Sequence, residues 1–146
     1  MKTTITQLFL RIAISISFLS AVGDRLGYWG KPGELNVSWG NWENFLAYSN
    51  SLNSFFSPSY GQVLALLATL SEITLAVMLL IGFKIKHSAI ASGILLTLFA
   101  VAMSLSIGIK VSFDYSVWIG VSACFLLSGI TYYPYSLDSY WAKKRK

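Results

Sequence analysis

The chain has 146 residues, of which 55% are hydrophobic and only 12% are charged, and its formal net charge is +5. A soluble domain carries about twice that share of charged residues, so the composition argues against a soluble protein. The basic residues stand at the ends of apolar segments, which argues against nucleic-acid binding and favours contact with a lipid bilayer.

Four apolar stretches are long enough to cross a bilayer, which needs about 20 residues of helix. They cover residues 4–23, 60–83, 88–109 and 115–133. The stretches are continuously apolar rather than alternating, which excludes a β-barrel, and the short links between the last three make those helices antiparallel neighbours. The sequence therefore predicts an all-α integral membrane four-helix bundle that forms a single domain over residues 1–146.

The first stretch has some features of a signal peptide, because a basic start precedes the apolar residues 8–22. However, Arg11 interrupts the apolar region, and residues 20–23 make a poor cleavage site. We therefore expect a retained first helix.

The segment between the first two spans, residues 24–59, is the longest connection in the chain. Residues 27–34 are rich in Gly and Pro and are typical of an irregular loop. Residues 41–56 place aromatic and leucine side chains near helical spacing, which predicts an amphipathic helix on the outer leaflet or over the end of the bundle. A loop packed down by its aromatic side chains is the alternative interpretation.

Lysine and arginine residues outside the spans are divided unevenly between the two sides. An N-terminus inside the cell puts seven of them in the cytoplasm, namely Lys2, Lys84, Lys86, Lys143, Lys144, Arg145 and Lys146. The opposite side receives three, namely Arg25, Lys31 and Lys110. The positive-inside rule therefore predicts that both termini, including the basic tail at residues 138–146, are cytoplasmic.

Two ionisable residues fall inside the predicted spans, where charge is costly and marks a candidate functional site. With a rise of about 1.5 Å per residue, Arg11 lies roughly 10 Å above the cytoplasmic edge and Glu72 roughly 16 Å. The difference of about 6 Å is within reach of two long side chains, so an Arg11–Glu72 ion pair is the predicted buried polar centre or ligand-binding site. Such a pair could equally serve only to fix the register of the helices.

A second polar group gathers at the outer ends of the spans. Asp24 and Arg25 end the first span, while Lys110 and Asp114 flank the link between the third and fourth. These four side chains could line an outer polar mouth, or each could be an ordinary charge at a helix end.

The inventory of metal ligands is small. The single histidine, His87, lies in a basic turn and the single cysteine, Cys124, in an apolar run, so they cannot supply a zinc or iron site, two haem ligands or a disulfide. We expect no metal and no covalently bound cofactor. Any chemistry would use carboxylates, arginine, aromatics or a cofactor held by a partner protein.

Four different short motifs stand in the first two spans and near the end of the chain. They are Leu10-Arg11, Gly23-Asp24-Arg25-Leu26, Glu72 with the closing Ile81-Gly82, and Tyr135-Ser136-Leu137-Asp138. In order and topology they resemble the DoxX-like family of small membrane proteins over the whole chain. The chain departs from the family at residues 131–134, where the family has glycines, and in its bulkier first loop.

The resemblance implies a four-helix bundle in the bacterial inner membrane, with Arg11, Arg25, Glu72 and Asp138 as the matching site residues. The family takes its name from a subunit associated with a terminal quinol oxidase and with thiosulfate:quinone oxidoreductase. We therefore expect an accessory subunit of a quinone-linked respiratory or redox system, with other membrane subunits as partners. Quinone would occupy an apolar cavity that opens toward one leaflet and has Glu72 or Arg11 at its inner end.

Two alternatives remain at this point. The chain could be a non-catalytic assembly or structural subunit of a larger complex, in which the buried charges only fix packing. It could also be a small proton-coupled transporter with Glu72 as the proton or cation site.

Overall fold

The computed structural model describes residues 2–53 and 57–144, and these residues form helices and connecting segments without a strand. The helices are α1 (Lys2–Arg25), α2 (Trp42–Leu52), α3 (Pro58–Ile81), α4 (Ile85–Ser106), α5 (Ile109–Asp114), α6 (Val117–Ser128) and α7 (Leu137–Lys144). This confirms the all-α prediction for the described part of the chain. Three of the helices, α1, α3 and α4, are long and apolar enough to cross a membrane.

The three long helices coincide with the first three predicted spans, with ends shifted by a few residues. The end of α3 has a clear local cause. Gly82 adopts a left-handed conformation, and the backbone N–H groups of Gly82 and Phe83 return to the carbonyl oxygens of Leu79 and Met78. This hydrogen-bond pattern closes a helix at a glycine and lets the chain reverse into α4 at once.

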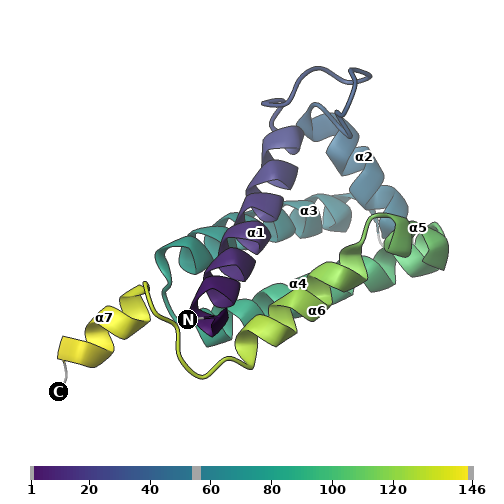
Figure 1. The fold of residues 1–146 in the computed structure, drawn as a ribbon. Helices are drawn as coiled ribbons and strands as arrows, with labels where there is room; N and C mark the ends of the chain where they lie inside the picture. Colours follow the sequence, from purple (N-terminus) through teal and green to yellow (C-terminus); the bar gives the residue numbers. More distant parts are fainter. Residues whose placement is uncertain (1, 54–56, 145–146) are drawn as a thin grey trace.

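The predicted fourth span, residues 115–133, is shorter in the structure, where α6 covers only Val117–Ser128 of it. α6 has 12 residues, which at about 1.5 Å per residue is well under the thickness of a hydrocarbon core of about 30 Å. A left-handed residue, Ser116, separates α6 from the six-residue α5. Both helices run back along α4, because Ser112 Oγ of α5 lies 2.9 Å from Ser104 Oγ and the Phe125 ring of α6 covers Gly93. α5 and α6 together thus form one interrupted arm antiparallel to α4 (Figure 1).

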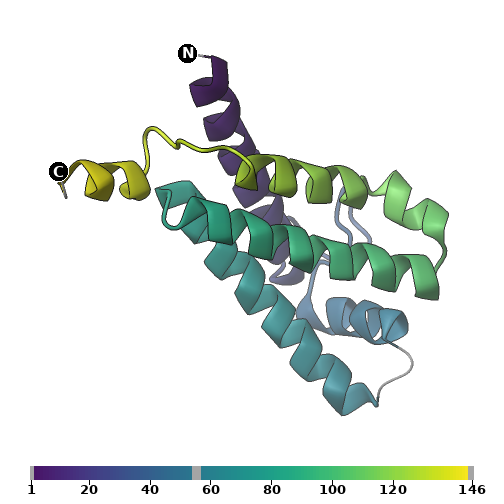
Figure 2. The ribbon, with the colours of Figure 1, turned by 90° about the horizontal axis from the view of Figure 1, so that it is seen from below.

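The long helices diverge from one end of the molecule. α3 and α4 diverge from the turn that joins them, and α2 lies between their far ends (Figure 2). Ser106 Oγ, at the end of α4, donates to the Leu52 carbonyl oxygen at 2.6 Å, which holds the last turn of α2 in this position. The amphipathic helix predicted within residues 41–56 is therefore present as α2 over the end of the bundle, while residues 54–56 lie outside the described part.

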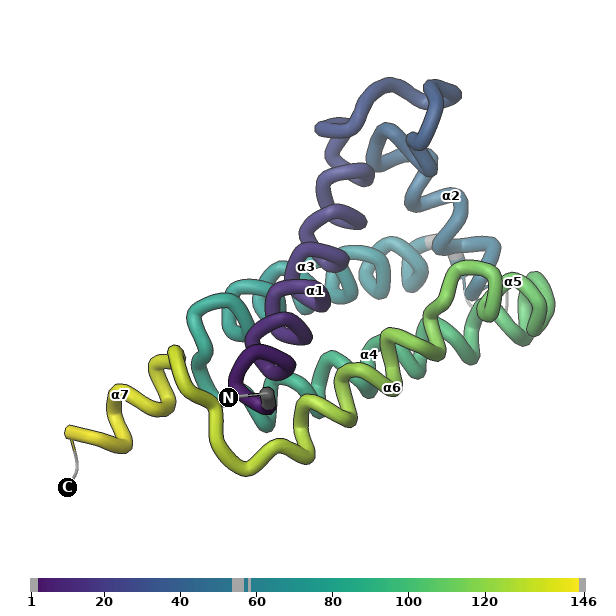
Figure 3. Tube along the Cα trace, viewed as in Figure 1, coloured from purple at the N-terminus to yellow at the C-terminus, as the bar shows by residue number. Residues whose placement is uncertain are grey.

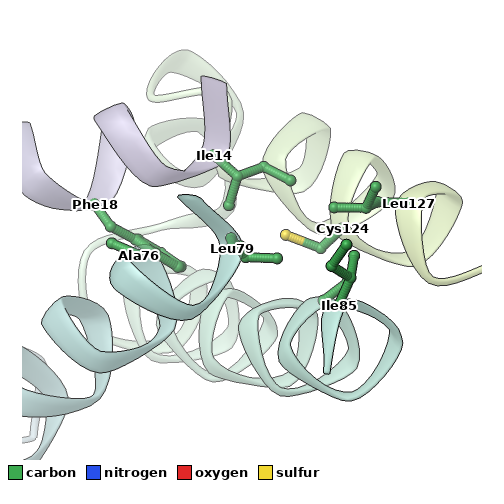
Figure 4. Close-up of a cluster of buried hydrophobic side chains, with 8 residues drawn as sticks. Ile14, Phe18, Ala76, Leu79, Ile85, Cys124 and Leu127 are labelled. Atoms are coloured by element: carbon green, nitrogen blue, oxygen red, sulfur yellow. The ribbon is translucent and has the colours of Figure 1, made fainter. Parts of the chain in front are cut away.

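The apolar core gathers where α1, α3, α4 and α6 meet (Figure 4). Its buried members are Ile14, Phe18, Ala76, Leu79, Ile85, Ala89, Cys124 and Leu127. Many other large apolar side chains point outward instead, such as Phe9, which is 70% exposed, and Ile119, also 70% exposed. Several polar side chains are buried, including Gln7, Ser15 and Ser92. Apolar exteriors with polar groups at the helix contacts are typical of helices packed within lipid.

We predict that Gly82→Ala destabilises the fold strongly. A Cβ at Gly82 would lie 2.6 Å from Arg11 Nη2 and 2.8 Å from Ser136 Cα, and φ is 73°. The left-handed backbone and the overpacking each cost about 1–3 kcal/mol, so we expect a loss of at least about 2 kcal/mol. Thermal unfolding in detergent measures it. Gly33→Ala is the matched control, because Gly33 also has a positive φ but no atom within 4 Å of the added Cβ, so only the backbone term should appear.

Candidate functional site: two buried arginine clusters

The first buried cluster joins the end of α1 to the middle of α3. Arg25 is 3% exposed and Glu72 2% exposed, and the guanidinium faces the carboxylate with two nitrogens. Nη1 of Arg25 bonds to Oε2 of Glu72, and Nη2 donates to Oε1 at 3.0 Å. Nη1 also donates to Thr69 Oγ1 at 2.8 Å. This paired geometry gives strong, directional hydrogen bonds and leaves both carboxylate oxygens of Glu72 occupied.

Aromatic side chains cover the Arg25 guanidinium of this Arg25–Glu72 pair. The guanidinium carbon of Arg25 lies 4.0 Å from the centre of the Phe45 ring and 5.4 Å from that of the Trp39 ring. The two rings also meet edge to face at 5.2 Å. A cation beside aromatic rings is stabilised electrostatically when water is excluded. Within the described residues Arg25 Nε has no hydrogen-bond partner, so the rings and Glu72 satisfy the guanidinium only in part.

Asp24 positions this aromatic cover by holding the loop that carries it. Its carboxylate accepts the backbone N–H groups of Ser38 at 2.8 Å and Gly40 at 3.0 Å, with a longer bond of 3.4 Å from Trp39. Asp24 and Arg25 are consecutive residues, so the first fixes the loop while the second reaches down to Glu72. These hydrogen bonds hold the Gly-rich loop, and the α2 helix that follows it, against the end of α1.

The predicted Arg11–Glu72 ion pair is wrong, because Glu72 pairs with Arg25. The hydrogen bond from Ser15 Oγ to the Ala76 carbonyl oxygen, 3.0 Å, sets the register of α1 against α3. Arg11 is four residues before Ser15 and Glu72 four residues before Ala76, so they point away along antiparallel helices and lie about 12 Å apart along the axis. The sequence-based depths were counted from the predicted end of each span, whereas α1 extends past the level where α3 ends.

Arg11 belongs to a second buried cluster, at the turn between α3 and α4. It is 1% exposed, and its Nε and Nη2 donate to the carbonyl oxygens of Leu79 at 2.9 Å and Leu80 at 3.0 Å. Nη1 donates to the Tyr135 carbonyl oxygen at 3.1 Å and to Gln7 Oε1 at 3.4 Å. The carbonyls of a helix end carry partial negative charge and can accept further hydrogen bonds, so a guanidinium is stabilised beside them. Arg11 thus ties α1, α3 and the segment before α7 together.

Asp138 completes this second cluster from the start of α7. Its carboxylate oxygens accept the backbone N–H groups of Lys84 and Ile85, each at 2.8 Å, and its own N–H donates to the Gly82 carbonyl oxygen at 3.1 Å. A carboxylate at the first N–H groups of α4 caps that helix from outside its own sequence. We refer to Gln7, Arg11, Gly82 and Asp138 as the turn cluster.

The four residues proposed to form an outer polar mouth lie in two separate places. Asp24 and Arg25 are buried in the first cluster, whereas Lys110 and Asp114 bond to each other on α5 and are exposed. No hydrogen bond or ion pair joins the two places, both of which are fully described. Burial raises the pKa of Tyr48 in α2, with a further contribution from Tyr115 at the end of α5.

Two surface grooves lie away from the buried charges. One, of about 360 Å³, is lined by Ile16, Leu19, Ser20, Gly23, Tyr28 and Trp29. The other, of about 350 Å³, is lined by Thr3, Thr4 and residues 129–132. Neither is lined by Arg11 or Glu72, which the expected ligand cavity would require. Among residues 2–53 and 57–144, no three His, Cys, Asp or Glu side chains gather as a metal site would need.

Two members of the clusters were not identified from the sequence. Thr69 stands three residues before Glu72 and Gln7 four residues before Arg11, so each lies on the same helix face as its neighbour. This spacing could have identified both residues from the sequence. The aromatic cover from Phe45 and Trp39 had no such signal, because only the path of the loop brings these rings to Arg25.

Comparisons with protein-family models, with curated proteins and with solved structures give no match for this chain.

Proposed function

We propose that the chain is an integral membrane accessory subunit that has no catalytic centre of its own and packs against other membrane proteins in the bilayer. One observation carries this proposal: the buried charged side chains are paired or hydrogen-bonded within the chain, with only Arg25 Nε left without a partner among the described residues, while large apolar side chains face outward. Glu72 is held by Arg25, and Arg11 by backbone carbonyl oxygens. Charges arranged in this way stabilise helix contacts and leave the apolar exterior for lipid and partner helices.

The proposed topology has four crossings and both termini in the cytoplasm of a bacterial inner membrane. It is supported by the position of the basic residues. The start of α1, the α3–α4 turn and α7 lie at one end of the molecule (Figure 3), and this end carries Lys84, Lys86, Lys143 and Lys144. At the other end Arg25 is neutralised by Glu72, which leaves fewer free basic residues there than the sequence suggested. The broken arm of α5 and α6 supplies the fourth crossing by running the length of α4.

We predict that a cysteine at position 31 is labelled by an impermeant maleimide in intact cells, and one at position 143 only after permeabilisation. Both Lys31→Cys and Lys143→Cys place the thiol at an exposed site. The native Cys124 is fully buried and is replaced by alanine in the background. Labelling of the Lys143→Cys chain in intact cells would contradict the topology.

A quinone-linked redox system is the partner class that we propose for this subunit. The resemblance to DoxX-like proteins is the basis, and the structure adds that the four matching residues occupy the two buried clusters. An apolar groove on α1, close to Trp29, has a volume in the range of small-molecule sites. Proton-coupled transport through Glu72 has less support, because Arg25 occupies both oxygens of its carboxylate.

The double variant Arg25→Met/Glu72→Leu tests the accessory proposal. Replacing a buried ion pair by apolar side chains of similar size is often neutral or stabilising, so the fold should survive. If the pair is only structural, native purification in polymer nanodiscs should recover the same partner proteins as with the wild-type chain, and activity of the complex should be retained.

Loss of the activity of the complex in a well-folded double variant would reject an accessory role for this pair. Lys110→Met/Asp114→Leu, which removes the exposed ion pair on α5, is the matched control. Extraction of the purified complex for quinone tests the redox assignment separately. Partner proteins without redox cofactors and without quinone would reject that assignment while leaving the accessory role intact.

A further inference from the structure

Acidic and basic residues are divided unevenly between the two ends of the molecule. The chain has six acidic residues, and Asp138 alone is at the end formed by the α3–α4 turn and α7. Four others, Asp24, Glu34, Glu43 and Asp114, belong to the opposite loops and helices, and Glu72 is buried between α1 and α3. By contrast, Lys84, Lys86, Lys143 and Lys144 are all exposed at the first end. We call these four lysines with Phe83, Tyr140 and Trp141 the basic aromatic surface.

Asp138, the one acidic side chain at this end among the described residues, does not neutralise the lysines. Both oxygens of Asp138 are occupied by the backbone N–H groups of Lys84 and Ile85. Its charge is therefore directed at the start of α4, and no ion pair joins it to a lysine side chain in the described residues. The ammonium groups remain available to an external anion.

Aromatic contacts keep α7 beside the turn between α3 and α4. Trp141 meets the Phe83 ring edge to face at 5.7 Å and 87°, and Lys84 Nζ lies 5.5 Å from the centre of the same ring. Tyr140 and Trp141 are nevertheless exposed, at 61% and 44%, and α7 buries none of its residues while it projects from the bundle (Figure 1). A projecting helix with exposed Trp, Tyr and Lys has the composition of a membrane interface rather than of a bundle core.

We propose that the basic aromatic surface binds the headgroups of anionic phospholipids in the leaflet at which α3 ends and α4 begins. Ile81 and Ile85 mark the ends of the apolar helices, so Lys84 and Lys86 stand where the hydrocarbon gives way to headgroups. α7 then lies along the interface with its aromatic rings at headgroup depth and Lys143 and Lys144 toward phosphate. The turn cluster fixes the angle at which α7 leaves the bundle. This inference goes beyond the accessory role and does not depend on the identity of the partner.

Lipid retention by the full chain tests this assignment. The chain is reconstituted in vesicles of equal parts phosphatidylglycerol and phosphatidylcholine, extracted in mild detergent and analysed for bound lipid by mass spectrometry. We expect phosphatidylglycerol to be retained several-fold over phosphatidylcholine, with less enrichment at high salt. Each lysine near an anionic surface is worth about fivefold in binding, so Lys84→Gln/Lys86→Gln/Lys143→Gln/Lys144→Gln should abolish the enrichment.

Two further variants separate charge from fold. Lys31→Gln/Lys110→Gln removes exposed lysines at the opposite end and should keep the enrichment. Replacing the same four lysines by arginine keeps the charge and should also keep it. Equal retention of the two lipids by the wild-type chain would overturn the proposal and would favour an acidic protein as the partner of this surface. Unchanged enrichment in the quadruple glutamine variant would overturn it as well.

Discussion

Glu72→Leu should destabilise the folded chain by about 3–5 kcal/mol, because it leaves the Arg25 guanidinium buried without a counter-charge. Arg25→Leu should cost a similar amount, since it strands the Glu72 carboxylate and removes the cation beneath the Phe45 ring. The Arg25→Met/Glu72→Leu double variant should be much closer to the wild-type chain than the sum of the single losses. Unfolding in detergent, followed by far-UV circular dichroism, measures all three.

The double-mutant cycle also distinguishes the observed pair from the one expected from sequence. Sites more than about 10 Å apart usually add to within about 0.5 kcal/mol, so Arg11→Leu and Glu72→Leu should be additive. Arg25 and Glu72 should instead show strong coupling. The exposed pair Lys110–Asp114 is the matched control and should contribute about 0–1 kcal/mol. Strong coupling of Glu72 to Arg11, or additivity with Arg25, would contradict the structure.

Arg11→Leu should have the second large effect, and it should act on the C-terminal segment as well as on the bundle. The guanidinium holds the carbonyl oxygens of Leu79, Leu80 and Tyr135, and each hydrogen bond to a charged group is worth about 1.5–3 kcal/mol. A leucine in its place removes these hydrogen bonds, leaves the Leu79 carbonyl oxygen only its bond from the Gly82 N–H, and releases the segment that leads to α7. We expect lower stability together with faster tryptic cleavage at Lys143 and Lys144.

Arg11→Lys separates the charge of this side chain from its geometry. A lysine keeps the positive charge but carries its donors on one nitrogen, so it cannot reach three carbonyl oxygens in different directions. We expect an intermediate loss of stability and partial release of α7. Lys31→Leu, at the opposite end, should leave cleavage at Lys143 unchanged. Wild-type cleavage rates in the Arg11→Leu chain would show that α7 is held by Asp138 and Trp141 without Arg11.

The long helices could be predicted from the sequence because they depend on local features of it. Long apolar runs predicted α1, α3 and α4, and α3 ends two residues before the predicted end because Gly82 takes the left-handed conformation that glycine adopts without strain. Residues 117–128 were predicted as part of a longer span. That helix is shorter than the predicted span of 115–133 mainly because it ends at Ser128, before Gly129, whereas the left-handed conformation of Ser116, rare for a serine, shifts only its start.

The partners of the buried charges were decided by register, which no single segment encodes. Sequence alone determined that Arg11 and Glu72 stand in apolar helices and need partners, because the cost of an unpaired charge in such surroundings is a property of the residue and its neighbours in the chain. Only the tertiary structure decided that Glu72 meets Arg25 and that Arg11 meets carbonyl oxygens. The reason is physical: a helix rises about 1.5 Å per residue, so an offset of a few residues between two antiparallel helices moves a side chain past one partner and opposite another.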